Sequence, residues 1–175
     1  METPFFLGKT ACCFTGHRPQ GLPDGGNARG PGMRQLAARL DAAVAAAAGA
    51  GVTTFYAGGA AGFDALAGEA VLREIERGAA IRLVLALPSR RYLATRNYRD
   101  AAPLLRLINA ADEIYYASET DNGRDALLAR NRYMVEHADC CIACLTENYG
   151  GTAYTVRYAQ SRGVPVINIA SIAEI

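Results

Sequence analysis

Short apolar runs alternate with amphipathic stretches along the chain. Runs rich in β-branched and aromatic residues predict strands, which we place at residues 10–15, 53–57, 81–87, 113–116, 140–145 and 164–169. Between them, apolar residues recur every three or four positions, a period that predicts helices. The clearest example comprises Met33, Leu36, Leu40 and Val44. We place helices at residues 33–48, 63–77, 99–110 and 124–137, and after Gly151.

This alternation of strands and helices predicts a Rossmann-like α/β fold. Right-handed crossovers between such strands give a three-layer sandwich with a mostly parallel, doubly wound sheet. The unbroken apolar run before Pro88 is typical of a strand that helices cover on both faces. The chain has 175 residues and contains no repeat, linker or low-complexity segment. We therefore expect one domain over residues 1–175.

Charge and composition narrow the classes of partner. Lys and Arg number 18 and Asp and Glu 17, for a net charge of +1, so we expect no duplex nucleic acid partner. The charge-free residues 42–63 are interrupted by glycines and by Thr53 and Thr54, and residues 1–7 lack a basic start. These features predict no membrane partner and a cytoplasmic location. Alanine-rich helices pack closely, so we also expect a homo-oligomer.

The cysteines predict buried thiols and no metal site. All five fall in apolar runs, namely Cys12, Cys13, Cys140, Cys141 and Cys144. Cys141 and Cys144 have the spacing of a zinc motif, but residues three apart in a strand point to opposite faces. We therefore expect reduced core thiols in a reducing compartment. We assign no metal and no cofactor.

Ligands of doubly wound sheets bind beyond the carboxyl ends of the strands, where the strand order switches. Four segments that we expect to meet there carry candidate ligand-binding residues. They are Thr15, Gly16, His17 and Arg18; Gly58, Gly59, Gly62 and Asp64; Arg130 and Asn131; and Gly150, Gly151 and Thr152.

Two of these segments are small residues that open a helix, which leaves free N–H groups and a positive dipole end for an anion. We expect residues 58–62 and 150–152 to hold phosphate and Arg18 to neutralise its charge. Asp64 then contacts ribose or, in the simpler alternative, caps its own helix. Asn131 reads ribose or base, or lies on a solvated helix face.

A further basic segment lies near the same edge of the predicted sheet. It contains Arg90, Arg91, Arg96 and Arg99. The ordinary interpretation is a solvated surface loop, and the alternative is a contact with phosphate or with a partner.

Four motifs, in this order, resemble the YpsA-like branch of the SLOG superfamily, which joins DprA/Smf and LOG-type Rossmann-like proteins. They are Cys-Phe-Thr-Gly-His-Arg-Pro at residues 13–19, Gly-Ala-Ala-Gly-Phe-Asp at 59–64, Arg-Asn-Arg-Tyr-Met-Val at 130–135 and Gly-Gly-Thr at 150–152. The resemblance implies a pocket for nucleotides or their derivatives, and sensor roles. It places around the ligand Gly16, Gly59, Asp64, Asn131, Gly150, Gly151 and Thr152.

The LOG-type relatives implied by this resemblance are nucleoside-monophosphate phosphoribohydrolases. Their glycine motif carries Glu three residues after its Thr, whereas this chain has Thr155 at that distance from Thr152. We therefore expect binding of a nucleoside monophosphate or an ADP-ribose-like molecule by a sensor or carrier. The alternative is an N-glycosidase in which Asp64 or Glu69 stabilises positive charge at the anomeric carbon. A scaffold without any ligand is the third possibility.

Overall fold

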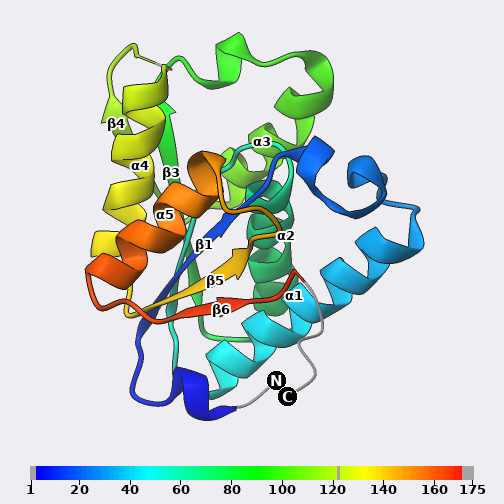
Figure 1. Cartoon of the computed structure of the whole chain (residues 1–175), viewed down its shortest axis with the longest axis vertical. Helices are drawn as coiled ribbons and strands as arrows, with labels where there is room; N and C mark the ends of the chain where they lie inside the picture. The colour runs from blue at the N-terminus through cyan, green and yellow to red at the C-terminus, as the bar shows by residue number, and fades with distance from the viewer. Residues whose placement is uncertain (1–2, 122, 171–175) are drawn as a thin grey trace.

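The computed structural model describes residues 3–121 and 123–170 and shows the predicted Rossmann-like α/β fold. Its sheet has the strand order β4-β3-β2-β1-β5-β6, and every pair of neighbouring strands in it is parallel (Figure 1). The strands are β1 Ala11–Gly16, β2 Thr54–Ala57, β3 Arg82–Ser89, β4 Glu113–Ser118, β5 Cys140–Cys144 and β6 Val166–Asn168.

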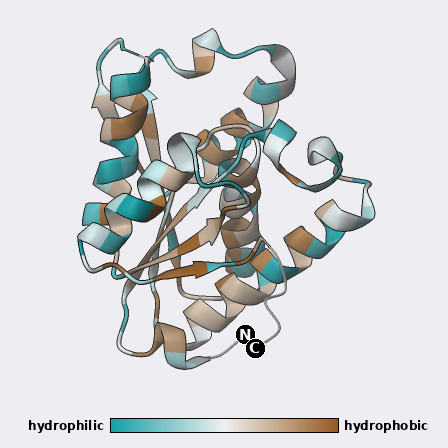
Figure 2. Cartoon of the chain, in the orientation of Figure 1, coloured by the Kyte–Doolittle hydropathy of each residue, from teal (hydrophilic) through white to brown (hydrophobic). Residues whose placement is uncertain are grey.

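Helices cover both faces of the sheet (Figure 1). One face packs against α1 Pro31–Gly49, α2 Phe63–Glu76 and α3 Tyr98–Ala110, and the other against α4 Arg124–Glu136 and α5 Gly150–Ser161. Short 3-10 turns lie at Thr3–Phe6, Pro19–Gly21, Pro23–Gly26 and Leu93–Thr95. The hydrophobic strands lie between the amphipathic helices (Figure 2).

The apolar stripe predicted for the first helix is confirmed. Met33, Leu36, Leu40 and Val44 are all buried in the core beneath α1, because residues at this spacing share one side of a helix. Pro31 at the first position and the turn after Gly49 set the ends of this helix.

Strand β3 continues to Ser89, one residue past Pro88, whereas the sequence pattern predicts that the strand ends before this proline. Its pairing with β2 stops at the register pair Ala57 and Leu85. Beyond that point β3 pairs with β4 alone, through Leu87 with Tyr116 and Ser89 with Ser118. The missing N–H of Pro88 therefore removes no hydrogen bond to β2, and the strand continues.

No helix within the described ranges has the length and hydropathy that crossing a bilayer requires. All five cysteines are buried and free. Cys141 and Cys144 pack into the two different core layers on opposite faces of the sheet, as the strand period predicts. Cys13 and Cys141 are register partners on β1 and β5.

We expect these thiols to be unreactive in the native protein. Burial raises the pKa of Cys144 to about 11, and the pKa of Cys12 is raised by burial and by its neighbour Cys140. Few thiolates are thus present at neutral pH, and reagents do not reach them. Ellman's reagent is expected to titrate five thiols in denaturant and none rapidly without it. A thiol that reacts in native protein as fast as free cysteine contradicts this packing.

Candidate functional site

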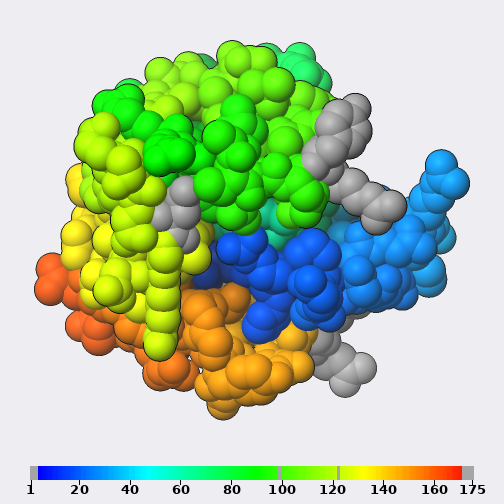
Figure 3. All heavy atoms as spheres, turned by 90° about the horizontal axis from the view of Figure 1, so that it is seen from above, coloured from blue at the N-terminus to red at the C-terminus, as the bar shows by residue number. Residues whose placement is uncertain are grey.

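A pocket of about 440 Å³ lies at the carboxyl ends of β1 and β5. These two strands are neighbours, yet the chain leaves β1 for α1 on one face of the sheet and β5 for α5 on the other. This divergence opens the crevice in which doubly wound folds bind ligands. In Figure 3, the segment after β1, the start of α4 and the start of α5 meet on one face of the molecule.

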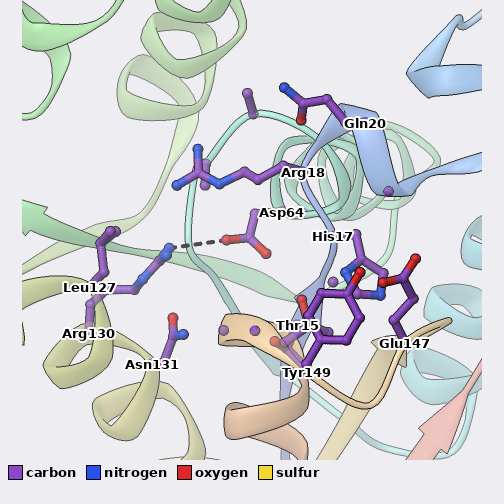
Figure 4. A pocket seen from close by; sticks show the side chains of 17 residues that line it. Thr15, His17, Arg18, Gln20, Asp64, Leu127, Arg130, Asn131, Glu147 and Tyr149 are labelled. Atoms are coloured by element: carbon purple, nitrogen blue, oxygen red, sulfur yellow. Dashed lines mark hydrogen bonds and ion pairs between the residues drawn. The ribbon is translucent and has the colours of Figure 1, made fainter. Parts of the chain in front are cut away.

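Four segments line the pocket, as the sequence predicts, and they bring ten of the predicted residues together. The lining residues are Thr15, Gly16, His17, Arg18, Gln20, Gly21, Ala60, Ala61, Asp64, Leu127, Arg130, Asn131, Glu147, Tyr149, Gly150, Gly151 and Thr152. Figure 4 places Leu127, Arg130 and Asn131 on one wall, and His17, Glu147 and Tyr149 on the other.

The segment after β1 is held by contacts to two other segments. A Cβ at Gly16 would lie 2.4 Å from the side chain of buried Phe63, so glycine is needed there. The N–H of Phe63 donates to the carbonyl of His17 at 3.0 Å. The His17 ring accepts through Nε2 from the N–H of Thr146, also at 3.0 Å. His17 thereby ties the loop after β1 to the loop after β5.

The glycines after β2 have a different role from the predicted one. Gly58, Gly59 and Gly62 are not among the lining residues; Ala60, Ala61 and Asp64 form this wall. A Cβ at Gly59 would lie 3.0–3.1 Å from the side chains of leucines in the core, so this residue packs against the core.

Gly58 and Gly62 instead permit close approaches of neighbouring groups. The carbonyl of Gly58 accepts a hydrogen bond from Arg130. A Cβ at Gly62 would meet the carbonyl oxygen of His17 at 2.5 Å. The first N–H of α2 donates to the carbonyl of His17, so this donor of the helix start is already paired within the protein.

Asp64 and Arg130 form a buried ion pair at the pocket wall (Figure 4). Nη1 of Arg130 lies 3.1 Å from the Asp64 carboxylate, and the two side chains are 5% and 9% exposed. Burial raises the pKa of Asp64, while the positive charges of Arg130 and Arg18 partly offset that rise. In the described part of the chain, Nε of Arg130 is buried and has no hydrogen-bond partner. The N-cap residue of α2 is Gly62, and Asp64 lies within the first turn of the helix. The Asp64 carboxylate also accepts a hydrogen bond from the backbone of Ala60.

A short chain of hydrogen bonds links the start of α5 to α4. Nδ2 of Asn131 donates to Oγ1 of Thr155 at 2.9 Å, and this hydroxyl donates to the carbonyl of Gly151 at 2.9 Å. The bonds fix Asn131 against α5. Gly150 has a φ of 82°, so the turn into the helix requires glycine. First-turn N–H groups of a helix lack intrahelical acceptors, and Gly150, Gly151 and Thr152 supply such groups to the pocket.

Residues missed by sequence reasoning complete the pocket. They are Gln20, Gly21, Leu127, Glu147 and Tyr149, whereas Ala60 and Ala61 belong to the segment 58–62 that the sequence predicts to hold phosphate. Leu127 lies three and four residues before Arg130 and Asn131, a spacing that places all three on one helix face and was available as a signal. Glu147 and Tyr149 lie immediately before the predicted glycine pair, but nothing local shows which way a loop side chain points.

Several other candidate residues lie away from this pocket. Glu69 pairs with Arg106 at 2.8 Å and lines a second, more apolar cavity beside α3, so it does not join Asp64 as the hydrolase alternative requires. Arg90 pairs with Glu119 and lies over the ring of Tyr116.

The other described arginines of the basic segment also lie outside the pocket lining. Arg96 lies over the ring of Tyr92, and Arg91 is absent from the pocket lining. The side chain of Arg99 falls outside the described residues. Among residues 3–121 and 123–170, no group of three or more His, Cys, Asp or Glu side chains is arranged to hold a metal ion.

Two solved structures share this fold. DNA processing protein A from Helicobacter pylori matches with a TM-score of 0.64 and 19% identity, over 90% of this chain and 63% of that one. DNA processing protein A (DprA) from Streptococcus pneumoniae matches with a TM-score of 0.67 and 17% identity, over 94% of this chain and 52% of that one. This chain thus spans less than two thirds of either protein. No curated protein sequence matches it.

The first of these neighbours overturns one prediction from charge. The Helicobacter pylori structure describes a single-stranded DNA binding mode. The prediction from net charge, which excluded a duplex nucleic acid partner, is therefore wrong as a way to set nucleic acid aside. A net charge near zero weakens the long-range field that duplex DNA requires. It does not prevent a few local donors from holding single phosphates of a flexible strand.

The sequence comparison assigns the family. A family model described as the YspA SLOG family matches residues 12–165. This span includes β1 from its second residue onward, all five helices and the four segments of the pocket. The two DprA structures agree with this fold. The chain therefore belongs to the YpsA (YspA SLOG) family.

Proposed function

We propose that this chain binds a nucleotide or nucleotide-derived small molecule, such as a nucleoside monophosphate or ADP-ribose, and acts as a sensor or carrier. One observation carries the proposal: the pocket at the strand switch point combines the first turn of α5 with two arginine side chains, Arg18 and Arg130. A pocket of about 440 Å³ is within the range of small-molecule sites, which is roughly 300–1,000 Å³.

The phosphate is expected at the start of α5. The N–H groups of Gly150, Gly151 and Thr152 are available there, and the helix dipole adds positive potential. A Cβ at Gly151 would meet nothing within 4 Å, so a phosphate has room to approach. The hydroxyl of Thr152 is a further donor at the same place.

Arg18 supplies the positive charge in this proposal. Arg130 also lines the pocket, but the carboxylate of Asp64 already neutralises it at 3.1 Å. Arg18 is exposed, and its charge reaches Asp64 strongly enough to oppose the rise in that group's pKa. Figure 4 shows Arg18 on the same side of the pocket as Asp64 and away from Glu147.

The ion pairs of Asp64 and Glu69 support binding of the nucleotide without its hydrolysis. A hydrolase that relies on Asp64 needs its negative charge for the anomeric carbon, and here Arg130 holds that charge. Glu69, the other predicted carboxylate, is engaged with Arg106 outside the pocket. We therefore propose that the bound nucleotide stays intact.

Calorimetric titration of the purified protein with AMP, ADP-ribose, NAD and a short single-stranded oligonucleotide tests the proposal. Gly151→Pro removes one N–H at a first-turn position that tolerates proline, and Gly151→Ala keeps it. Loss of one charge-assisted hydrogen bond is expected to weaken nucleotide binding about 10- to 100-fold in Gly151→Pro. Gly151→Ala is expected to stay within about threefold of the wild type.

Mass spectrometry of the bound fraction is expected to recover intact nucleotide. Free base in that fraction overturns the sensor proposal in favour of an N-glycosidase. Binding of the oligonucleotide alone, with no free nucleotide bound by folded protein, overturns the small-molecule proposal and assigns the pocket to single-stranded nucleic acid.

A further inference from the structure

Tyr149 presents an exposed aromatic ring at the mouth of the pocket. Among the described residues, large hydrophobic side chains are exposed at Leu7, Leu105 and Tyr149. Tyr149 is 71% exposed, the most of these, and it alone of the three lines this pocket. An aromatic ring left in water at a concave polar site offers a flat apolar face to a ligand.

The backbone of Tyr149 has a defined place relative to the proposed phosphate donors. Tyr149 is the N-cap residue of α5, with extended φ and ψ of −135° and 170°, and it directly precedes Gly150. Its hydroxyl interacts with the carboxylate of Glu147, which raises the pKa of Tyr149. The Cα of Tyr149 therefore lies one step, roughly 3.8 Å, from the Cα of Gly150, the first of the proposed donor residues.

The ring and the arginine side of the pocket are separate. Figure 4 shows Tyr149 with His17 and Glu147 on one wall, and Arg130 and Asn131 on the opposite wall. In a nucleotide, the base and the phosphate lie at opposite ends of the ribose. With phosphate at the start of α5, the base has an aromatic ring within reach on the Tyr149 wall.

We propose that Tyr149 determines specificity for nucleotides over simple phosphorylated sugars by stacking on the nucleobase. This inference rests on the proposed function of the same pocket. Stacking accepts any base, since every base has a π face, so Tyr149 selects a base-bearing ligand and does not select among bases. Glu147 interacts with the hydroxyl of Tyr149, and the largely exposed ring remains open to a ligand.

The test compares two ligands that differ only in the base, AMP and ribose 5-phosphate. In Tyr149→Ala the affinity for AMP is expected to fall about 5- to 100-fold, the range of a lost base–aromatic stack. The affinity for ribose 5-phosphate is expected to change less than about twofold, as for an exposed side chain that makes no contact. Tyr149→Phe keeps the ring and is expected to retain AMP binding. Tyr154→Ala is the matched control, because Tyr154 lies on the same helix outside the pocket lining.

A spectroscopic readout gives independent evidence of stacking. The chain contains no Trp, so Tyr149→Trp introduces a single indole at the site. Its fluorescence is expected to be quenched by AMP and unchanged by ribose 5-phosphate.

Equal weakening of both ligands in Tyr149→Ala overturns the inference, because the residue then only shapes the phosphate loop. An unchanged AMP affinity overturns it as well. If the wild type binds ribose 5-phosphate and AMP equally, the inference about Tyr149 fails while the proposed phosphate site stands. If folded wild type binds neither, the proposed function fails too.

Discussion

Replacing Arg130 with Met is expected to lower the free energy of unfolding by about 3–5 kcal/mol, the cost of removing one partner of a buried ion pair. The substitution leaves the Asp64 carboxylate buried without its counter-charge and removes the donor to the carbonyl of Gly58. Urea denaturation followed by circular dichroism measures the loss. Arg106→Met is the control, because it breaks the exposed pair with Glu69 and is expected to cost less than about 1 kcal/mol.

The pH dependence of this variant follows from the direction of the Asp64 pKa. Burial raises the pKa of Asp64 in the folded protein, so the folded state binds this proton more tightly than the unfolded state. This group therefore favours folding more as pH falls through its folded pKa. Without Arg130 that pKa rises further. The deficit of Arg130→Met relative to wild type is thus expected to be smaller at pH 5 than at pH 7.5.

Adding Asp64→Leu to Arg130→Met is expected to recover most of the lost stability. An apolar pair of similar volume needs no counter-charge, and such replacements are often neutral or stabilising. If the double variant is as unstable as Arg130→Met, the lost stability does not come from an unpaired Asp64. A deficit of Arg130→Met that grows as the solution is acidified contradicts the charge argument directly.

Gly62→Ala is expected to destabilise the protein by more than about 3 kcal/mol, because strain and collision add. Gly62 has a φ of 98°, and an added Cβ would lie 2.5 Å from the carbonyl oxygen of His17 and 2.9 Å from the backbone of Arg18. These are backbone atoms, which cannot turn away as a side chain does. Thermal and urea unfolding measure the effect.

The chain provides a matched control at Gly78. This glycine also has a φ of 98°, but an added Cβ there would meet nothing within 4 Å. Gly78→Ala is expected to cost about 1–2 kcal/mol from backbone strain alone. The difference between the two variants measures the contact between the loops after β1 and β2. Equal costs for both variants would falsify that contact.

Much of the architecture could be predicted from local patterns. The helical period from Met33 to Val44, the charge-free strand at 140–144 and glycines at element ends are each readable within one short window. The opposite faces of Cys141 and Cys144 follow from strand geometry in the same way. The boundaries differ by one or two residues, most visibly at Pro88, where the partner strand decides whether a missing N–H matters.

The site was less predictable because its side-chain directions depend on distant segments. The glycine pair at the start of α5 lines the pocket as expected, since a helix start exposes its N–H groups wherever it lies. The glycines after β2 look equivalent in sequence. In the structure the N–H of Phe63 donates to the carbonyl of His17, and Arg130 donates to the carbonyl of Gly58. The space beside Gly62 is taken by the backbone of His17 and Arg18. These partners come from other elements.

The sequence by itself determined the order and type of the elements, the parallel sheet and the four segments at its carboxyl edge. Hydrophobic periodicity can be read within one short segment, and crossover connections between parallel strands have a fixed, right-handed sense. Tertiary structure alone decided that Asp64 pairs with Arg130, 66 residues away, that Glu69 faces another cavity, and that Tyr149 stands at the pocket mouth. Each of these outcomes depends on which side chain of a second element occupies the adjacent space, and no window of one segment contains that information.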